Sequence, residues 1–304
     1  MEYVLTTQGL SKHYKSFKAL DNLTMHVPKG GIYGFVGRNG AGKTTLIRVI
    51  CGLQAPTFGS YTLYGTDSRE KAIVKSRRRM GAVVETPSIY LNMTAEDNLK
   101  EQYRVLGMPS FEGIPELLKL VGLENTGKKK ARNFSLGMKQ RLGIAVALAG
   151  EPDFLVLDEP VNGLDPQGII EIRELILKLN RERQITVLIS SHILDELSRL
   201  ATHYGFIDSG RMLKEISAAE LEAACRKCLR VEVTDAGALV RVLDRMGADF
   251  QILNDRQADV YARVNISQLS RALDAEGCEL LSAQERDESL ESYFVNLAGG
   301  GSNA

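Results

Sequence analysis

One stretch of the sequence, GRNGAGKTT, constrains the possible fold more than any other feature. It matches the pattern G-x-x-x-x-G-K-[ST] from Gly37 to Thr44, follows the apolar run GIYGFVG, and precedes a helical pattern from about Lys43. In this context the glycines let backbone N–H groups point at phosphate oxygens, and the helix start adds positive potential. The sequence therefore predicts a phosphate-binding loop between a buried strand and a helix.

The motif also assigns a role to its side chains. We expect Lys43 to reach the β- and γ-phosphates of a nucleoside triphosphate, and the Thr44 hydroxyl to ligate Mg²⁺. Thr45 is expected to support the α-phosphate. The loop residues predicted to bind the nucleotide are Gly37, Arg38, Asn39, Gly40, Ala41, Gly42, Lys43, Thr44 and Thr45.

Two further apolar runs have the character of buried strands. FLVLDEP begins at Phe154 and ITVLISSH begins at Ile185, and each leads into a helical pattern. Near-continuous apolar strands separated by helices indicate a parallel sheet that is covered on both faces. At the end of the first run, we expect Asp158 to be a second Mg²⁺ contact and Glu159 to polarise an attacking water.

The remainder of the first two thirds divides into two kinds of pattern. The segments 3–8, 20–27 and 60–64 alternate between apolar and polar residues, which favours an antiparallel subsheet. Between about 86 and 150 the strand signal is absent, and Thr94 is a plausible helix N-cap. That region is interpreted as a helical insertion, so the fold class is α/β.

Beyond residue 216 the pattern becomes strand, helix, strand, strand, helix, strand, which is the order of a ferredoxin-like unit. We therefore predict a nucleotide-binding domain over 1–216, an accessory α+β domain over 217–297 that ends in the helix ESLESYFVNLA, and a flexible tail over 298–304. Cys225 and Cys228 form a C-x-x-C, for which a redox or zinc role is one reading and an ordinary structural role the other.

Charge and hydropathy exclude several classes of partner. The chain has 38 basic and 38 acidic residues, so bulk charge gives no reason to expect nucleic acid or an anionic membrane surface. No run approaches the roughly 20 apolar residues of a membrane helix, and the N-terminus lacks the order of a signal peptide. We expect the chain to stay in the cytoplasm.

The order of these motifs carries a family resemblance. The phosphate loop is followed by S-x-G-x-x-Q at 135–140, then by the acidic strand end, then by Ser-His. Over 3–216 the chain resembles the ATP-binding cassette (ABC) ATPases. The resemblance implies a head-to-tail dimer with two composite sites. In it, Ser135, Leu136 and Gly137 contact the γ-phosphate of ATP held by the second copy.

The same resemblance assigns four other positions. Tyr14 stands where the family stacks an aromatic ring on adenine, although a packing role at a strand edge is the alternative. Asp165 in NGLDPQG is expected at the dimer interface, and His192 matches the switch histidine that contacts the γ-phosphate. Glu85 replaces the usual Gln. Its carboxylate is expected near Mg²⁺, where it either ligates the ion more strongly or disfavours the γ-phosphate.

Glu85, the run SLGMKQRL and the C-terminal extension together look similar to bacitracin- and lantibiotic-type exporter ATPases. The implied function is ATP hydrolysis that drives a separate membrane permease, with export of a drug or antimicrobial peptide, from the inner face of the membrane. Ile89, Tyr90 and Leu91 are candidate permease contacts, or they pack the insertion.

The alternative function is that of a soluble ABC ATPase acting on nucleic acid or ribosomes, which the single cassette and zero net charge disfavour. A P-loop GTPase or kinase is disfavoured because no N-K-x-D motif is present.

Overall fold

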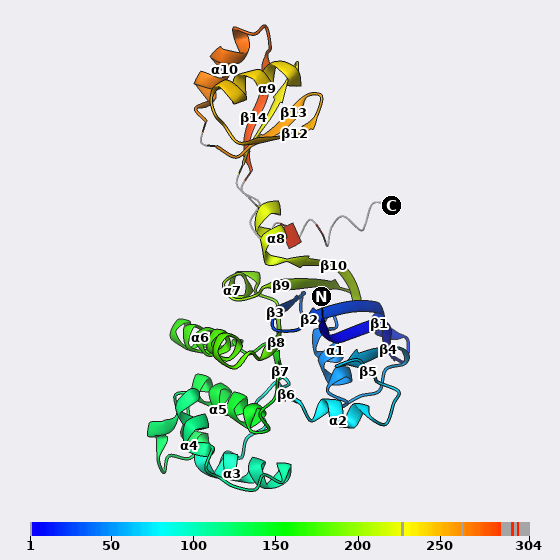
Figure 1. Ribbon diagram of the computed structural model, residues 1–304, viewed down its shortest axis with the longest axis vertical. Helices are drawn as coiled ribbons and strands as arrows, with labels where there is room; N and C mark the ends of the chain where they lie inside the picture. The colour runs from blue at the N-terminus through cyan, green and yellow to red at the C-terminus, as the bar shows by residue number, and fades with distance from the viewer. Residues whose placement is uncertain (1, 226–227, 263, 287–292, 295–296, 298–304) are drawn as a thin grey trace. The chain divides into compact units, whose positions relative to one another are not determined.

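The chain divides into two compact units, Met1–Ala218 and Ala219–Ala304. The domain boundary predicted after residue 216 lies next to this division. The predicted tail over 298–304, and most of the predicted last helix, lie outside the described residues. The computed structural model (Figure 1) describes residues 2–225, 228–262, 264–286, 293–294 and 297.

A six-stranded sheet forms the centre of the first unit as described, with strand order β10-β9-β3-β8-β7-β6. Its strands are β3 (Ile32–Val36), β6 (Met80–Val83), β7 (Phe154–Asp158), β8 (Thr186–Ser191), β9 (His203–Asp208) and β10 (Arg211–Ser217). All neighbouring pairs are parallel except β9 and β10. Every residue of β3, β7 and β8 is buried, as their apolar runs predict, so the predicted parallel sheet is confirmed.

A second sheet of the first unit has the order β2-β1-β4-β5 and consists of antiparallel pairs. Its strands are β1 (Tyr3–Tyr14), β2 (Phe17–Pro28), β4 (Phe58–Leu63) and β5 (Thr66–Asp67). The predicted antiparallel subsheet is therefore confirmed. Its first two strands are longer than predicted, because β1 and β2 continue pairing up to a tight turn between Tyr14 and Phe17.

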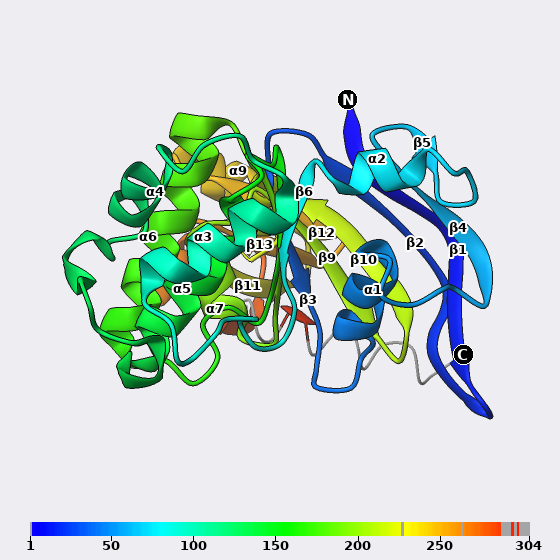
Figure 2. The same ribbon diagram turned by 90° about the horizontal axis from the view of Figure 1, so that it is seen from below.

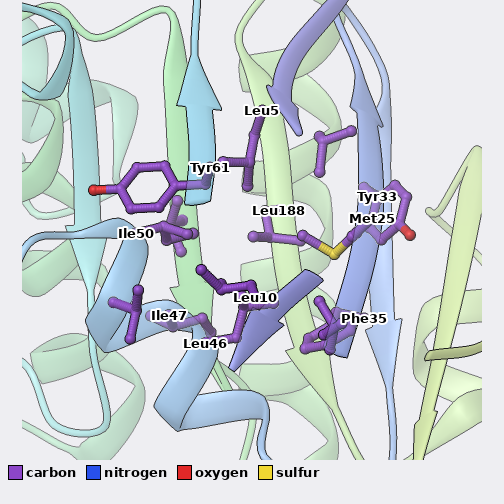
Figure 3. Packing of buried hydrophobic residues seen from close by; sticks show 14 of the residues in the cluster. Leu5, Leu10, Met25, Tyr33, Phe35, Leu46, Ile47, Ile50, Tyr61 and Leu188 are labelled. Atoms are coloured by element: carbon purple, nitrogen blue, oxygen red, sulfur yellow. The ribbon is translucent and has the colours of Figure 1, made fainter. Parts of the chain in front are cut away.

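The two sheets share one apolar core with helix α1 (Lys43–Ile50). Figure 3 shows Leu46, Ile47 and Ile50 of this helix among buried side chains from β1, β4 and β8. All three side chains have no exposed surface. A helix packed this tightly is a rigid base for the loop at its N-terminus, because displacing it would open cavities in the core.

The predicted helical insertion is confirmed, since no strand is assigned between Val83 and Phe154, a range that the structure describes throughout. The helices here are α3 (Ala95–Leu106), α4 (Ile114–Leu120) and α5 (Leu136–Leu148), with short 3₁₀ turns η1 (Glu124–Thr126) and η2 (Ala131–Asn133). Thr94 caps α3 as predicted, because its Oγ1 accepts a hydrogen bond from the backbone N–H of Asp97 at 3.1 Å.

Helices cover both faces of the six-stranded sheet. Figure 2 shows α1 on one side of this sheet and α5, α6 (Pro166–Arg183) and α7 (Leu194–Ser198) on the other. A short helix, α2 (Ile73–Arg77), lies beside β4 and β5. This arrangement leaves the carboxyl ends of the parallel strands open to loops, which is where open α/β sheets bind ligands.

In the second unit, helix α8 (Ala218–Ala224) leads into a β-α-β-β-α-β unit with the strand order β12-β13-β11-β14. Its elements are β11 (Cys228–Val233), α9 (Ala236–Arg245), β12 (Phe250–Asn254), β13 (Gln257–Val260), α10 (Ile266–Asp274) and β14 (Leu280–Arg286). All strand pairs are antiparallel. Leu239 of α9 and Leu269 of α10 are fully buried in one core with the strands. The predicted ferredoxin-like order is confirmed.

Candidate ATP-binding and hydrolysis site

Strand register brings the predicted site residues to one edge of the six-stranded sheet. Strand β8 lies between β3 and β7, the last residue of β3 pairs with Ser191, and Asp158 pairs with Ser190. The N–H of Gly37 donates to the Ser191 carbonyl at 3.3 Å, and the N–H of Glu159 donates to the Ser190 carbonyl at 3.2 Å. The phosphate loop, the acidic pair and the histidine segment therefore all leave the sheet side by side.

Backbone geometry explains why the loop is rich in glycine. Gly40 and Gly42 have φ angles of +82° and +110°, which residues with a side chain rarely adopt. A Cβ on residue 42 would also lie 2.5 Å from the carbonyl oxygen of Ala19, and a Cβ on residue 37 would lie 2.6 Å from that of Ile207. The tight loop thus needs glycine at positions 37 and 42 because a Cβ would collide there, and it favours glycine at position 40 because of the backbone angle.

Lys43, Glu159 and His192 form a continuous chain of contacts. The buried ammonium of Lys43 donates to the carbonyl oxygens of Gly37 at 2.6 Å and Arg38 at 3.2 Å, and it lies 3.1 Å from Oε1 of Glu159. The other carboxylate oxygen of Glu159 lies 2.8 Å from Nδ1 of His192. The structure therefore brings together the predicted phosphate-binding lysine, the predicted general base and the predicted switch histidine.

Asp158 has the character expected of a cation contact. It is 1% exposed, and its Oδ1 accepts a hydrogen bond from Ser190 Oγ at 2.6 Å. Its Oδ2 is buried and has no hydrogen-bond partner in the structure as described. Leaving a buried carboxylate oxygen unpaired is costly, and a cation with its hydration shell would satisfy it.

The donor set around Asp158 fits Mg²⁺, which prefers oxygen ligands and is usually held by one or two protein groups together with substrate phosphates and water. The carboxylate of Asp158 and the hydroxyl of Thr44, in the first turn of α1, are such groups. Within the described ranges, no group of three His, Cys, Asp or Glu side chains could hold a metal ion, including at Cys225 and Cys228. Nucleotide phosphates and water would supply further oxygen ligands beside Asp158 and Thr44.

Sequence reasoning missed one residue of the site, Ser190. Its hydroxyl donates to Asp158 Oδ1 and also accepts a hydrogen bond from the backbone N–H of Glu159 at 2.9 Å. It is fully buried and so holds both members of the acidic pair in place. The only sequence signal was the Ser-Ser doublet before His192, which has no motif of its own.

Replacing Ser190 with Ala is expected to raise the Mg²⁺ concentration needed for half-maximal ATP hydrolysis several-fold and to destabilise the fold by about 1–3 kcal/mol, because the buried Oδ1 of Asp158 loses its hydrogen-bond donor. Mg²⁺ titration of ATPase activity and urea unfolding measure the two effects. Ser191→Ala is the matched control, since the Ser191 hydroxyl exchanges hydrogen bonds with the backbone of Ile193 and not with the acidic pair in the structure as described. Equal behaviour of the two variants would contradict the role of Ser190.

In this structure Glu85 forms an ion pair with a residue of α1. Its Oε1 lies 2.6 Å from Nη2 of Arg48, and its backbone has a φ angle of +60°. About half of the Glu85 side chain is exposed. The prediction that Glu85 is near the metal stays a prediction.

Tyr14 lies at the end of β1 and is 40% exposed. Its hydroxyl donates to the side chain of Gln54, and the ammonium of Lys12 lies 5.4 Å from its ring centroid. A ring this exposed is not a core residue, which disfavours the packing alternative. Its predicted contact with adenine stays a prediction.

The signature residues lie on a separate groove. Ser135 caps α5 by accepting from the N–H of Met138 at 3.2 Å, and Asp165 caps α6 by accepting from the N–H of Gly168 at 3.0 Å. Both helix N-termini border one groove of about 460 Å³. Its lining includes Ser135, Leu136, Gly137, Gly163, Leu164 and Asp165. Two positive helix ends on one surface favour an anionic occupant.

A further carboxyl group, that of Glu196, follows His192 by four residues. Glu196, on α7, has a buried Oε2 with no hydrogen-bond partner in the structure as described. Burial raises the pKa of Glu196, the negative charge of Glu159 raises it further, and His192 opposes the shift.

Fold and site together define a P-loop nucleotide hydrolase whose loop, acidic pair and histidine share one sheet edge. A family model described as "ABC transporter" matches residues 20–162. The bacitracin transport ATP-binding protein BcrA of Bacillus licheniformis is 42% identical over 99% of both chains. The lantibiotic transport ATP-binding protein SrtF of Streptococcus pyogenes is 43% identical over 70% of this chain and 90% of its own. A dimeric ABC transporter cassette, MJ0796, matches with a TM-score of 0.64 and 26% identity, covering 70% of this chain and 98% of that one.

The chain belongs to the ABC transporter ATP-binding proteins. It is an ATPase subunit of an ABC transporter, as the order of its motifs predicts, and a role as a GTPase or kinase is excluded by this membership. No helix in the described part of the chain is long and apolar enough to cross a membrane.

Proposed function

We propose that this chain binds and hydrolyses Mg·ATP in a head-to-tail dimer and thereby drives a separate permease that exports a drug or antimicrobial peptide. The observation that carries the hydrolytic part is the strand register that brings Lys43, Asp158 and Glu159 to one edge. The substrate class rests on the relatives named for bacitracin and lantibiotic transport.

Each side chain then has a defined task. The N–H groups of the loop and the ammonium of Lys43 bind the phosphates, and Thr44 and Asp158 hold Mg²⁺, which neutralises phosphate charge when bound. Glu159 accepts a proton from the attacking water. His192, in contact with Glu159 at 2.8 Å, orients that carboxylate and meets the γ-phosphate.

The signature groove supports the proposal of a dimer. Ser135, Gly137 and Asp165 lie on a groove whose lining contains none of the phosphate-loop residues. A second copy placed head-to-tail would bring this groove to the nucleotide, and two-fold symmetry would complete both sites at once. Each site is then incomplete in one chain alone.

The permease contact is proposed at the segment after Glu85. Tyr90 and Leu91 are 58% and 48% exposed, whereas Ile89 is partly buried. Large exposed apolar side chains on one short segment are suitable anchors for a helix of another protein. Through this contact the chain would be held at the inner face of the membrane.

The test is recovery of the tagged full chain from detergent-solubilised membranes of its own cell, followed by mass spectrometry. A multi-span protein in stoichiometric amount is the expected result. Tyr90→Asp with Leu91→Asp should lower its recovery at least about fivefold, because burying two carboxylates at an interface is costly. Ile252→Asp with Leu253→Asp is the control, since these residues of β12 are 38% and 40% exposed in the other unit. Recovery only with ribosomes or nucleic acid would contradict the proposal.

A further inference from the structure

Glu85 is a carboxylate at the position where the family has Gln, in a chain whose proposed triphosphate site already contains Asp158 and Glu159. Its carboxylate is paired with Arg48 at 2.6 Å. Arg48 belongs to α1, the helix that begins at the phosphate loop, and no motif in the sequence singles it out. The pair therefore joins the nucleotide-binding helix to the loop that follows β6.

The position of Arg48 on α1 connects the ion pair to the proposed nucleotide site. Arg48 follows Thr44 by four residues, so the two side chains lie on the same face of the helix, about one turn apart. Thr44 is the proposed Mg²⁺ contact. The ion pair therefore attaches the Glu85 carboxylate to the residue one turn beyond Thr44 on α1.

The loop held by this pair also contacts the signature helix. A Cβ on Gly143 of α5 would lie 2.5 Å from Cβ of Pro87, so this part of the loop lies directly against α5. Glu85 has a left-handed backbone at φ +60°, which is uncommon for a residue with a side chain and persists where surrounding contacts fix it. The ion pair with Arg48 is one such contact on the α1 side.

We propose that Arg48 is a positioning residue that acts as the counter-ion of Glu85, and that it makes a carboxylate tolerable at the position where the family has Gln. The inference rests on the proposed function only in that α1 binds Mg·ATP. Arg48 and Glu85 are 36% and 53% exposed, and exposed ion pairs are weak. A weak pair can neutralise Glu85 and still release it when the nucleotide binds.

The test is the dissociation constant for ATP, measured calorimetrically on the full chain with and without Mg²⁺. Four proteins are compared: wild type, Arg48→Met, Glu85→Gln and the double variant. Arg48→Met should weaken Mg·ATP binding about three- to tenfold, because the unpaired carboxylate repels the phosphates over a distance of several ångströms. This loss should shrink at high salt. The double variant should bind as tightly as Glu85→Gln alone, because Arg48 then has no carboxylate to neutralise.

Arg104→Met is the matched control, since Arg104 forms an exposed ion pair with Glu101 on α3. An equal loss from Arg48→Met in the wild-type chain and in the Glu85→Gln variant would overturn the inference, as it would show a structural role independent of the charge. No loss in either background would also overturn it. A wild-type chain that does not bind ATP would instead overturn the proposed function, and this inference with it.

Discussion

Glu159→Gln is expected to lower the ATPase rate about 10²–10⁴-fold while ATP binding is retained, because a neutral amide cannot accept the proton of the attacking water. The two oxygens of Glu159 contact Lys43 at 3.1 Å and His192 at 2.8 Å, so the carboxylate is held between both groups. An amide of the same size keeps the packing of the site. Steady-state phosphate release and equilibrium ATP binding measure the two effects separately.

The control for this variant is Glu174→Gln, which removes an exposed carboxylate of α6 that is paired only with Arg173 among the described ion pairs. It should hydrolyse ATP at the wild-type rate. Hydrolysis by Glu159→Gln at a similar rate would show that another group is the base. In that case the contact with Lys43 would be a structural ion pair rather than part of the reaction.

Lys43→Met is expected to weaken ATP binding about 10–100-fold. A hydrogen bond to a charged group contributes about 1.5–3 kcal/mol, and each 1.4 kcal/mol corresponds to a tenfold change in affinity. The substitution also removes the bonds from the ammonium to the carbonyl oxygens of Gly37 and Arg38, which hold the loop closed. Titration with ATP in the presence of Mg²⁺ measures the loss.

Lys29→Met is the matched control, because Lys29 forms an exposed pair with Glu2 and lies before β3. Its ATP affinity should equal that of wild type. If Lys43→Met bound ATP as tightly as this control, the buried lysine would serve only to pair with Glu159 and the loop carbonyls, and the phosphate-binding assignment would be wrong.

Elements with a characteristic pattern in their own residues were predictable from the sequence. The fully apolar runs of β7 and β8 and the loop GRNGAGKTT identified the parallel sheet and its phosphate site. The order strand, helix, strand, strand, helix, strand predicted beyond residue 216 matches β11, α9, β12, β13, α10 and β14. These signals are local, because the residue pattern that predicts each element lies within the element itself.

Features that depend on register were not predictable. Ser190 contacts Asp158 only because β8 pairs with β7 in one register, and Arg48 meets Glu85 across 37 positions of the chain. The hairpin of β9 and β10 was also missed, since most residues of β10 are only partly buried and give no clear alternation. Such contacts depend on tertiary packing and strand register, so they cannot be predicted from local sequence patterns alone.

The most direct test of the account is the mass of the Glu159→Gln chain in solution, measured by light scattering with ATP and Mg²⁺. The account predicts twice the 33.5 kDa mass of one chain with ATP and a single-chain mass without it. Adding Ser135→Arg should prevent the dimer and leave ATP binding intact, because the signature groove meets only the nucleotide of the second copy. A single-chain mass at ATP concentrations that saturate the Glu159→Gln chain would contradict the composite site.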